Sequence, residues 1–153
     1  MPLEINSSAF EPGQPIPTRH TADGPDDSPP LGWSGAPEGT RSFTLICDDP
    51  DAPMGTWVHW VLYNLPPEVN ELPEGIPTDP RLPDGSCQGK NDFGRFGYGG
   101  PSPPPGKPHR YFFKVYALDS MLELGPGATK ADIEQEMSGH IMEEGELVST
   151  YRR

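Results

Sequence analysis

The stretch DDPDAPMGTWVHWVLYNLP, residues 48–66, joins a stiff acidic turn to a long apolar run and decides much of the fold. In its first half, Pro50 and Pro53 lie among three aspartates, fix their own backbone φ angles and end any preceding strand. Its second half, from Trp57 to Leu65, is largely apolar on both alternating faces. This pattern predicts a central β-strand that is covered on both sides.

Strict alternation along this strand predicts which side chains accompany its histidine. One face would carry Trp57, His59, Val61, Tyr63 and Leu65. The other face would carry Val58, Trp60, Leu62 and Asn64. A histidine between two tryptophans therefore needs a structural or functional reason.

Two further runs predict neighbouring strands. RSFTLICDD (41–49) ends at the acidic turn, and HRYFFKVYALD (109–119) alternates two faces, of which one carries His109, Tyr111, Phe113, Val115 and Ala117. Between these strands, residues 11–40 and 66–108 are rich in proline and glycine and predict loops with short extended pieces.

One segment has a helical pattern, from Thr129 to about Glu144. Thr129 can cap its start with Asp132 at the capping-box position, and an apolar stripe follows at Ile133, Met137, Ile141 and Met142. The tail ELVSTYRR (146–153) predicts a short final strand. The sequence thus predicts one mainly β, antiparallel domain over residues 1–153, with a helix near its carboxyl end.

Composition argues against several classes of partner. The formal net charge of −12 argues against nucleic acid and anionic membranes, which select basic surfaces. No window approaches the roughly 18 apolar residues of a membrane span, and the amino terminus does not resemble a signal peptide. We therefore expect a cytoplasmic protein. Cys47 is predicted to be buried in an apolar run and Cys87 to lie in a loop; two cysteines in such a chain are more often reduced, but the sequence leaves a disulfide between them open.

The four histidines separate into two groups. His20 is predicted in an exposed loop, and His140 on the helix in a structural or partly exposed position. His59 and His109 lie in strands beside tight loops; if these strands are neighbours, both imidazoles open into one pocket, where Asp49 or Asp51 can orient one of them. The glycine-rich loop 94–106 is predicted to bring backbone N–H groups close to a ligand.

Each of these features also has a structural interpretation. A histidine flanked by tryptophans is equally the pattern of a hydrogen-bonded core residue. His109 can simply begin a strand, and the Asp-Pro-Asp-Ala-Pro run can be a turn in which aspartates cap backbone groups. The residues by themselves leave these alternatives open.

Three stretches together resemble one family. PPLGWSGAPEGTRSFTLICDDPDAP, then HWVLYNLP, then GRFGYGGPSPPPGKPHRYFFKVYALD are similar, in order and spacing, to the phosphatidylethanolamine-binding protein family. The resemblance runs from about Phe10 to Tyr151 and is strongest to the bacterial and archaeal Raf-kinase-inhibitor-like branch.

The resemblance implies a large antiparallel sheet packed against a smaller one in a Greek-key arrangement, with a preformed anion pocket. Carried over position by position, it implies the ligand-binding residues Asp49, Asp51, Trp57, His59, Pro101, His109 and Tyr111. It also implies a homodimer. We expect no cofactor and no bound metal. Because the chain ends at STYRR, without the carboxyl-terminal helix of animal members, we do not expect a Raf-type partner.

The leading hypothesis is a non-enzymatic protein that binds phosphate-like anions or phosphoethanolamine-type headgroups, with a regulatory role through a protein partner. A second hypothesis is a protease or kinase inhibitor that acts through the irregular segment 66–88. A third is a metal-dependent hydrolase built on His59, His109 and Asp49 or Asp51, since two histidines and a carboxylate can bind catalytic zinc.

Overall fold

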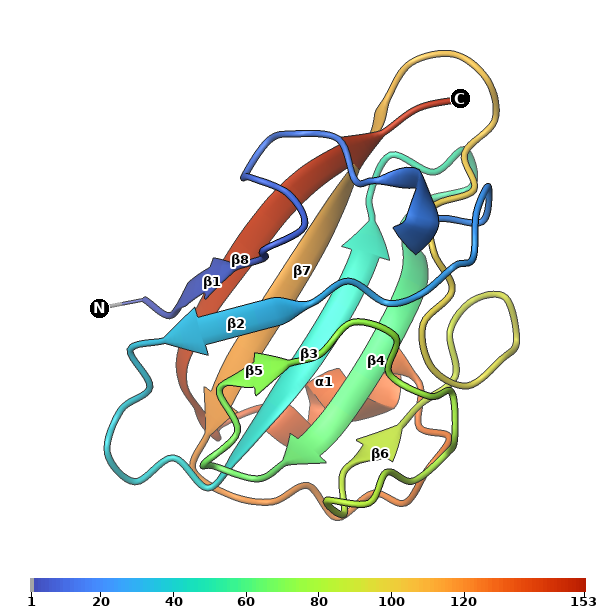
Figure 1. Ribbon diagram of the computed structural model, residues 1–153. Coiled ribbons are helices and arrows are strands. Elements are labelled where there is room, and N and C mark those ends of the chain that lie inside the picture. Colours follow the sequence, from blue (N-terminus) through green and yellow to red (C-terminus); the bar gives the residue numbers. More distant parts are fainter. Residues whose placement is uncertain (1) are drawn as a thin grey trace.

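The structure, a computed structural model, describes residues 2–153 and contains two antiparallel sheets and one α-helix (Figure 1). The small sheet has the strand order β1-β2-β5, with β1 at Glu4–Asn6, β2 at Leu31–Ser34 and β5 at Glu71–Leu72. The large sheet has the order β6-β4-β3-β7-β8, with β3 at Ser42–Asp49, β4 at Trp57–Leu65, β6 at Cys87–Gln88, β7 at His109–Leu118 and β8 at Ile141–Tyr151. A short 3-10 helix, η1, spans Thr18–His20, and α1 spans Lys130–Met137. The predicted mainly β architecture with a second, smaller sheet is confirmed.

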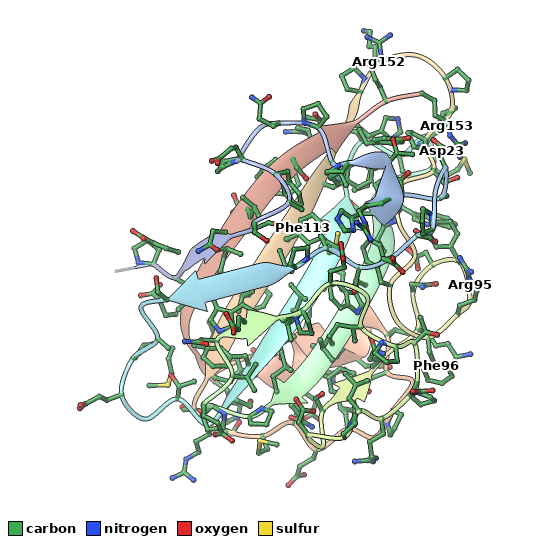
Figure 2. The ribbon with its side chains drawn as sticks, viewed as in Figure 1. Asp23, Arg95, Phe96, Phe113, Arg152 and Arg153 are labelled. Carbon is green, nitrogen blue, oxygen red and sulfur yellow. The ribbon has the colours of Figure 1, made fainter. Side chains whose placement is uncertain are left out.

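Each face of the large sheet is covered by a different element. The small sheet packs on one face, where Ile5, Leu31 and Trp33 join a core with side chains of β3, β4 and β7. Helix α1 packs on the other face through Ile133 and Met137. As predicted, Tyr111, Phe113, Val115 and Ala117 of β7 all belong to the first core (Phe113 is labelled in Figure 2).

The predicted alternation in β4 is wrong from Trp60 to Tyr63, and a second irregularity, opposite Phe43–Leu45, returns Leu65 to the core under the small sheet. Cys47 pairs with Trp60 but Asp48 pairs with Val58, so β4 has one extra residue at His59. An extra residue in one strand reverses the sides of the residues that follow it. Trp60 and Leu62 therefore lie in the core under the small sheet, whereas Val61 and Tyr63 pack on the side of α1.

The predicted helix is also too long. Its start is confirmed, because Thr129 Oγ1 accepts the backbone N–H of Asp132 and Asp132 Oδ2 accepts that of Thr129. It ends at Met137, two residues before Gly139, which has a φ of +84° that suits glycine. Ile141 begins β8 instead, and its side chain is 43% exposed. Pairing of β8 along the whole of β7 outweighs the local helical pattern.

The segments between the long strands are mostly irregular, as predicted. Within residues 66–108 only the two-residue strands β5 and β6 form. In the part of the chain that the structure describes, no helix has the length and apolar character needed to cross a membrane.

Candidate functional site

A cavity of about 220 Å³ opens at the end of the large sheet where β3 ends and both β4 and β7 begin. These strand ends adjoin because β3 pairs antiparallel with both of its neighbours, for example Asp49 with Trp57. The lining consists of Asp49, Ala52, Pro53, Met54, Trp57, His59, Phe93, Ser102, Pro103, Pro104, His109 and Tyr111. Five of the seven predicted site residues are therefore brought together here: Asp49, Trp57, His59, His109 and Tyr111.

His59 is held at the base of this cavity, and its exposed fraction is 3%. Its Nδ1 donates a hydrogen bond of 2.6 Å to the carbonyl oxygen of Gly99, and the Gly99 N–H donates back to the His59 carbonyl at 2.9 Å. Tyr111 and Phe93 contact the ring edge-to-face, with centroids at 5.2 and 5.5 Å. Burial lowers the pKa of His59. The ring is thus neutral near neutral pH, with Nε2 as a hydrogen-bond acceptor.

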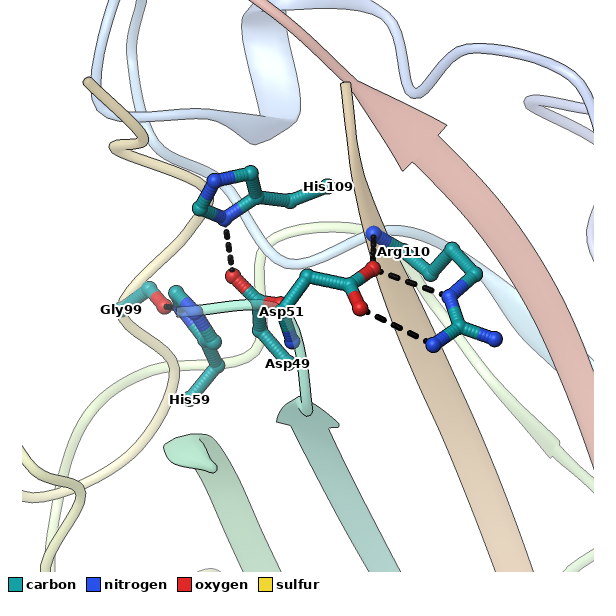
Figure 3. A network of polar contacts seen from close by, with 6 residues as sticks. All are labelled: Asp49, Asp51, His59, Gly99, His109 and Arg110. Carbon is teal, nitrogen blue, oxygen red and sulfur yellow. Dashed lines mark hydrogen bonds and ion pairs between the residues drawn. The ribbon is translucent and has the colours of Figure 1, made fainter. Parts of the chain in front are cut away.

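His109 is oriented by Asp49, the last residue of β3 (Figure 3). Its Nδ1 lies 2.7 Å from Asp49 Oδ2, while Oδ1 of the same carboxylate accepts the backbone N–H of Asp51 at 2.7 Å. Since a carboxylate only accepts, Nδ1 of His109 carries the proton and Nε2 is the ring atom left for a ligand.

Asp51 does not line the cavity; it binds Arg110 on the outside of the turn (Figure 3). Its two oxygens accept hydrogen bonds of 2.9 Å from Nε and Nη2 of Arg110, and Oδ2 also accepts the Arg110 backbone N–H at 2.9 Å. This guanidinium lowers the pKa of Asp51 to about 2. Asp51 therefore ties the acidic turn to the start of β7. Pro101 is buried outside the cavity lining, and its carbonyl accepts the Ala22 N–H at 3.0 Å.

The glycines of the loop 94–106 do not present their N–H groups to the cavity, contrary to the expectation for them. All five glycine N–H groups donate within the chain, from Gly94 to Asn91, Gly97 to Gly89, Gly99 to His59, Gly100 to Asp26 and Gly106 to Arg153. The loop instead supplies Ser102, Pro103 and Pro104 to the wall.

Sequence reasoning missed the apolar rim of the cavity. Phe93 packs edge-to-face on Trp57 at 5.5 Å, and Met54, which is 93% exposed, lies at the mouth. Phe93 stands just before the glycine-rich loop, and Met54 follows directly on the Asp-Pro-Asp-Ala-Pro turn. Because both residues are adjacent to loops that the sequence predicts to border the site, their positions could have indicated that they line the cavity.

The remaining two histidines lie elsewhere. His20 is only 1% exposed, which contradicts the predicted exposed loop; its Nδ1 bonds the carbonyl of Asp27 at 2.8 Å. His140 lies in the turn after α1, beside Asp119 at 2.8 Å. Cys47 and Cys87 are both buried and unpaired with each other.

Metal binding needs at least three suitable side chains close together. Within residues 2–153, no group of three His, Cys, Asp or Glu side chains has such an arrangement. The described residues therefore offer no ligand set for the metal-dependent hydrolase hypothesis.

Comparison with known proteins identifies the family. The sequence profile described as phosphatidylethanolamine-binding protein matches residues 6–152. A "UPF0098 protein" of Methanothermobacter thermautotrophicus is 51% identical over 151 residues, covering 99% of both chains, and UPF0098 protein YbhB of Escherichia coli is 42% identical over 137 residues, covering 84% of this chain and 87% of its own.

Solved structures agree with this assignment. The crystal structure of E. coli YbcL, described as a member of the mammalian PEBP family, superposes with a TM-score of 0.91 at 35% identity and covers 100% of this chain and 99% of its own. That of CT736 from Chlamydia trachomatis, described as a putative PEBP homolog, gives 0.90 at 39% identity, covering 99% and 98%. The chain therefore belongs to the phosphatidylethanolamine-binding protein family.

Proposed function

We propose that the cavity binds the headgroup of a phosphate ester and that the protein acts by binding, not by catalysis. The supporting observation is the pair of imidazoles from His59 and His109 in one cavity, each held through Nδ1 by an acceptor of the chain. Both rings are fixed before any ligand arrives, and both offer Nε2. Preformed donors and acceptors of this kind reduce the entropy lost on binding.

The charge of the cavity depends on its histidines. A phosphate oxygen needs a donor, and Nε2 donates only when the imidazole is protonated. Binding should therefore take up protons, and the affinity for a phosphate ester should rise as the pH falls. The Asp49 carboxylate balances the charge of a protonated His109. Beside a neutral His109 ring, it leaves a negative charge near the site that suits the ammonium of phosphoethanolamine.

The apolar rim favours an ester over inorganic phosphate. Ala52, Pro53, Met54, Phe93 and Pro104 line the cavity beside its polar residues. The organic part of an ester can bury apolar surface there, at about 25 cal/mol for each Å² removed from water, whereas inorganic phosphate gains nothing.

An enzyme with a nucleophilic serine has less support than the proposed binding function. Asp49 and His109 resemble two members of a Ser-His-Asp triad, and Ser102 lines the same cavity. However, among residues 2–153 no hydrogen bond joins Ser102 to His109, and Ser102 lies between prolines in an irregular loop. A triad needs its nucleophile within hydrogen-bond reach of its base.

The test is an NMR titration of the four imidazoles with phosphoethanolamine and with inorganic phosphate, near pH 6 in the presence of EDTA. We expect the signals of His59 and His109 to shift together and those of His20 and His140 to stay unchanged. Phosphoethanolamine should bind more tightly than phosphate. If neither ligand moves the His59 and His109 signals, the proposed function is wrong.

A further inference from the structure

A single peptide group, the one between Gly99 and Gly100, connects His59 to the loop that contains Asp26. The carbonyl of this peptide accepts the hydrogen bond from His59 Nδ1 at 2.6 Å. Its N–H, which belongs to Gly100, donates to Asp26 Oδ1 at 2.9 Å. The two hydrogen bonds therefore lie at opposite ends of one planar unit, and the imidazole and the carboxylate hold it from both sides.

The orientation of this peptide determines which nitrogen of His59 carries the proton. A carbonyl oxygen only accepts, so in the observed orientation Nδ1 must be protonated and Nε2 is the acceptor of the neutral ring. If the peptide turned over, its N–H would face Nδ1 and would require the opposite tautomer. The histidine would then present an Nε2–H to the cavity in its neutral form.

Nothing in the local sequence prevents such a rotation, because the peptide lies between two glycines. Glycine has no Cβ and admits backbone angles that other residues avoid. The constraint comes from Asp26, since an ionised carboxylate accepts but cannot donate. In the rotated peptide the Gly99 carbonyl would face this carboxylate, and two acceptors would oppose each other.

The surrounding loop supports the same arrangement. Tyr98 donates its hydroxyl hydrogen bond to the His20 carbonyl at 2.6 Å, and Ala22 donates its N–H to the Pro101 carbonyl at 3.0 Å. A side chain on Gly100 would overlap both Asp26 Oδ1 and the His20 carbonyl. The strip 98–101 is thus packed closely against residues 20–26.

Asp26 also has an uncommon backbone conformation. Its φ is +62°, and within residues 2–153 the only other non-glycine residue with a positive φ is Asn64. Aspartate adopts this region more readily than most residues, but the conformation still has a cost. The strained backbone places the carboxylate against the Gly100 N–H.

From these contacts we infer that Asp26 is a positioning residue that selects the Nδ1–H tautomer of His59 by locking the Gly99–Gly100 peptide. The consequence for ligand binding rests on the proposed function, but the effect on the tautomer does not. Asp26 lies outside the cavity lining and acts only through this peptide.

The variant that tests this is Asp26→Gly, because glycine removes the carboxylate and also relieves the positive φ. The ring ¹⁵N shifts of His59 report its tautomer. We expect Nδ1–H in the wild type and a mixture containing Nε2–H in Asp26→Gly. Because neutral His59 would then offer an Nε2–H donor to the phosphate, the affinity for phosphoethanolamine at about pH 7.5 should rise about fivefold in Asp26→Gly. Asp26→Asn tolerates positive φ, but its amide can donate to the rotated carbonyl as well as accept from the Gly100 N–H, so it too should admit the Nε2–H tautomer.

Asp27→Ala is the matched control, because this neighbouring carboxylate contacts Arg19 at 3.9 Å and not the peptide. It should leave the ¹⁵N shifts unchanged. Unchanged His59 shifts in Asp26→Gly would overturn the inference, whereas a wild type that binds no phosphoethanolamine would overturn only the proposed function. If Asp26→Gly does not fold, the inference is tested on the wild-type protein. We expect a scalar coupling across the hydrogen bond, from Gly100 ¹⁵N to Asp26 ¹³Cγ. Its absence would show that Asp26 does not hold this peptide.

Discussion

The carboxylate of Asp49 joins the end of β3 to the start of β7, because its Oδ2 accepts a hydrogen bond of 2.7 Å from Nδ1 of His109. The same carboxylate holds the following turn through its other oxygen, which accepts the Asp51 N–H at 2.7 Å. Asp49 is 3% exposed. One buried side chain thus orients an imidazole of the cavity and shapes the turn that forms its rim.

Replacing Asp49 by alanine should therefore destabilise the protein clearly. The substitution leaves the Asp51 N–H and the His109 ring, both partly buried, without their acceptor, and a buried group left unsatisfied typically costs about 1–3 kcal/mol. Chemical denaturation near neutral pH measures the loss. Asp51→Ala is the control, since its exposed pair with Arg110 should contribute only about 0–1 kcal/mol. Equal losses in the two variants would contradict this interpretation of Asp49.

The buried His59 should make stability depend on pH in a defined direction. Burial lowers its folded-state pKa below the ordinary value of 6.5, so the unfolded chain binds more protons than the folded protein just below that pH. Above about pH 6.5 the protonation of His59 therefore does not affect the free energy of unfolding. As the pH falls from there toward the folded-state pKa, the free energy of unfolding decreases progressively. Comparing urea unfolding of wild type and His59→Asn across this range isolates the effect. Parallel pH profiles would show that His59 has no such shift.

Asp51 should titrate far below a normal aspartate. Arg110 lowers its pKa from 3.8 to about 2, so the carboxylate stabilises the folded protein above about pH 4 and this stabilisation is lost as the pH falls through about 2. A ¹³C NMR titration of the Asp51 carboxyl measures the midpoint directly. In Arg110→Gln the midpoint should rise toward 3.8. A wild-type midpoint already near the ordinary value would mean that the pair does not persist in solution.

Local patterns in the sequence predicted the main strands and the residues that meet at the cavity. The strands 41–49, 57–65 and 109–119 were recognisable because each is a continuous apolar or alternating run bounded by turn residues. Once β4 and β7 both flank β3, the histidines at their starts must lie near Asp49 at its end. Whether these residues bind a ligand remains a prediction.

Features that depend on contacts far apart in the sequence could not be predicted. The extra residue at His59 appears only in the register against β3, and β8 forms only because β7 is available to pair with it. His20 is buried by Tyr98 and its neighbours, 78 residues away. No local sequence pattern identifies Asp26, because its inferred role depends on its hydrogen bond with the distant Gly100 N–H.

Replacement of Gly145 and of Gly125 by alanine should have different effects on the stability of the protein. Gly145 lies in β8, where a Cβ would overlap the Leu3 carbonyl and its neighbours as the N-terminal segment passes over the strand. Gly145→Ala should therefore cost about 1–3 kcal/mol or more, because backbone atoms must move. Gly125 has open space and no positive φ, so Gly125→Ala should be nearly neutral. Thermal unfolding of both variants measures the contrast, and a stable Gly145→Ala would show that the N-terminal segment is not held against β8.

Both cysteines should be inert toward thiol reagents in the native protein. Cys47 and Cys87 are buried in the cores on opposite faces of the large sheet, and burial raises the pKa of the Cys47 thiol well above its ordinary value. Thiolate, not thiol, reacts with DTNB, and neither sulfur is accessible without opening of the core. We expect no rapid reaction in the native state and two reactive thiols after unfolding in guanidinium chloride. Fast native modification of either cysteine would show that its side of the core opens readily, and a single reactive thiol after denaturation would indicate prior oxidation.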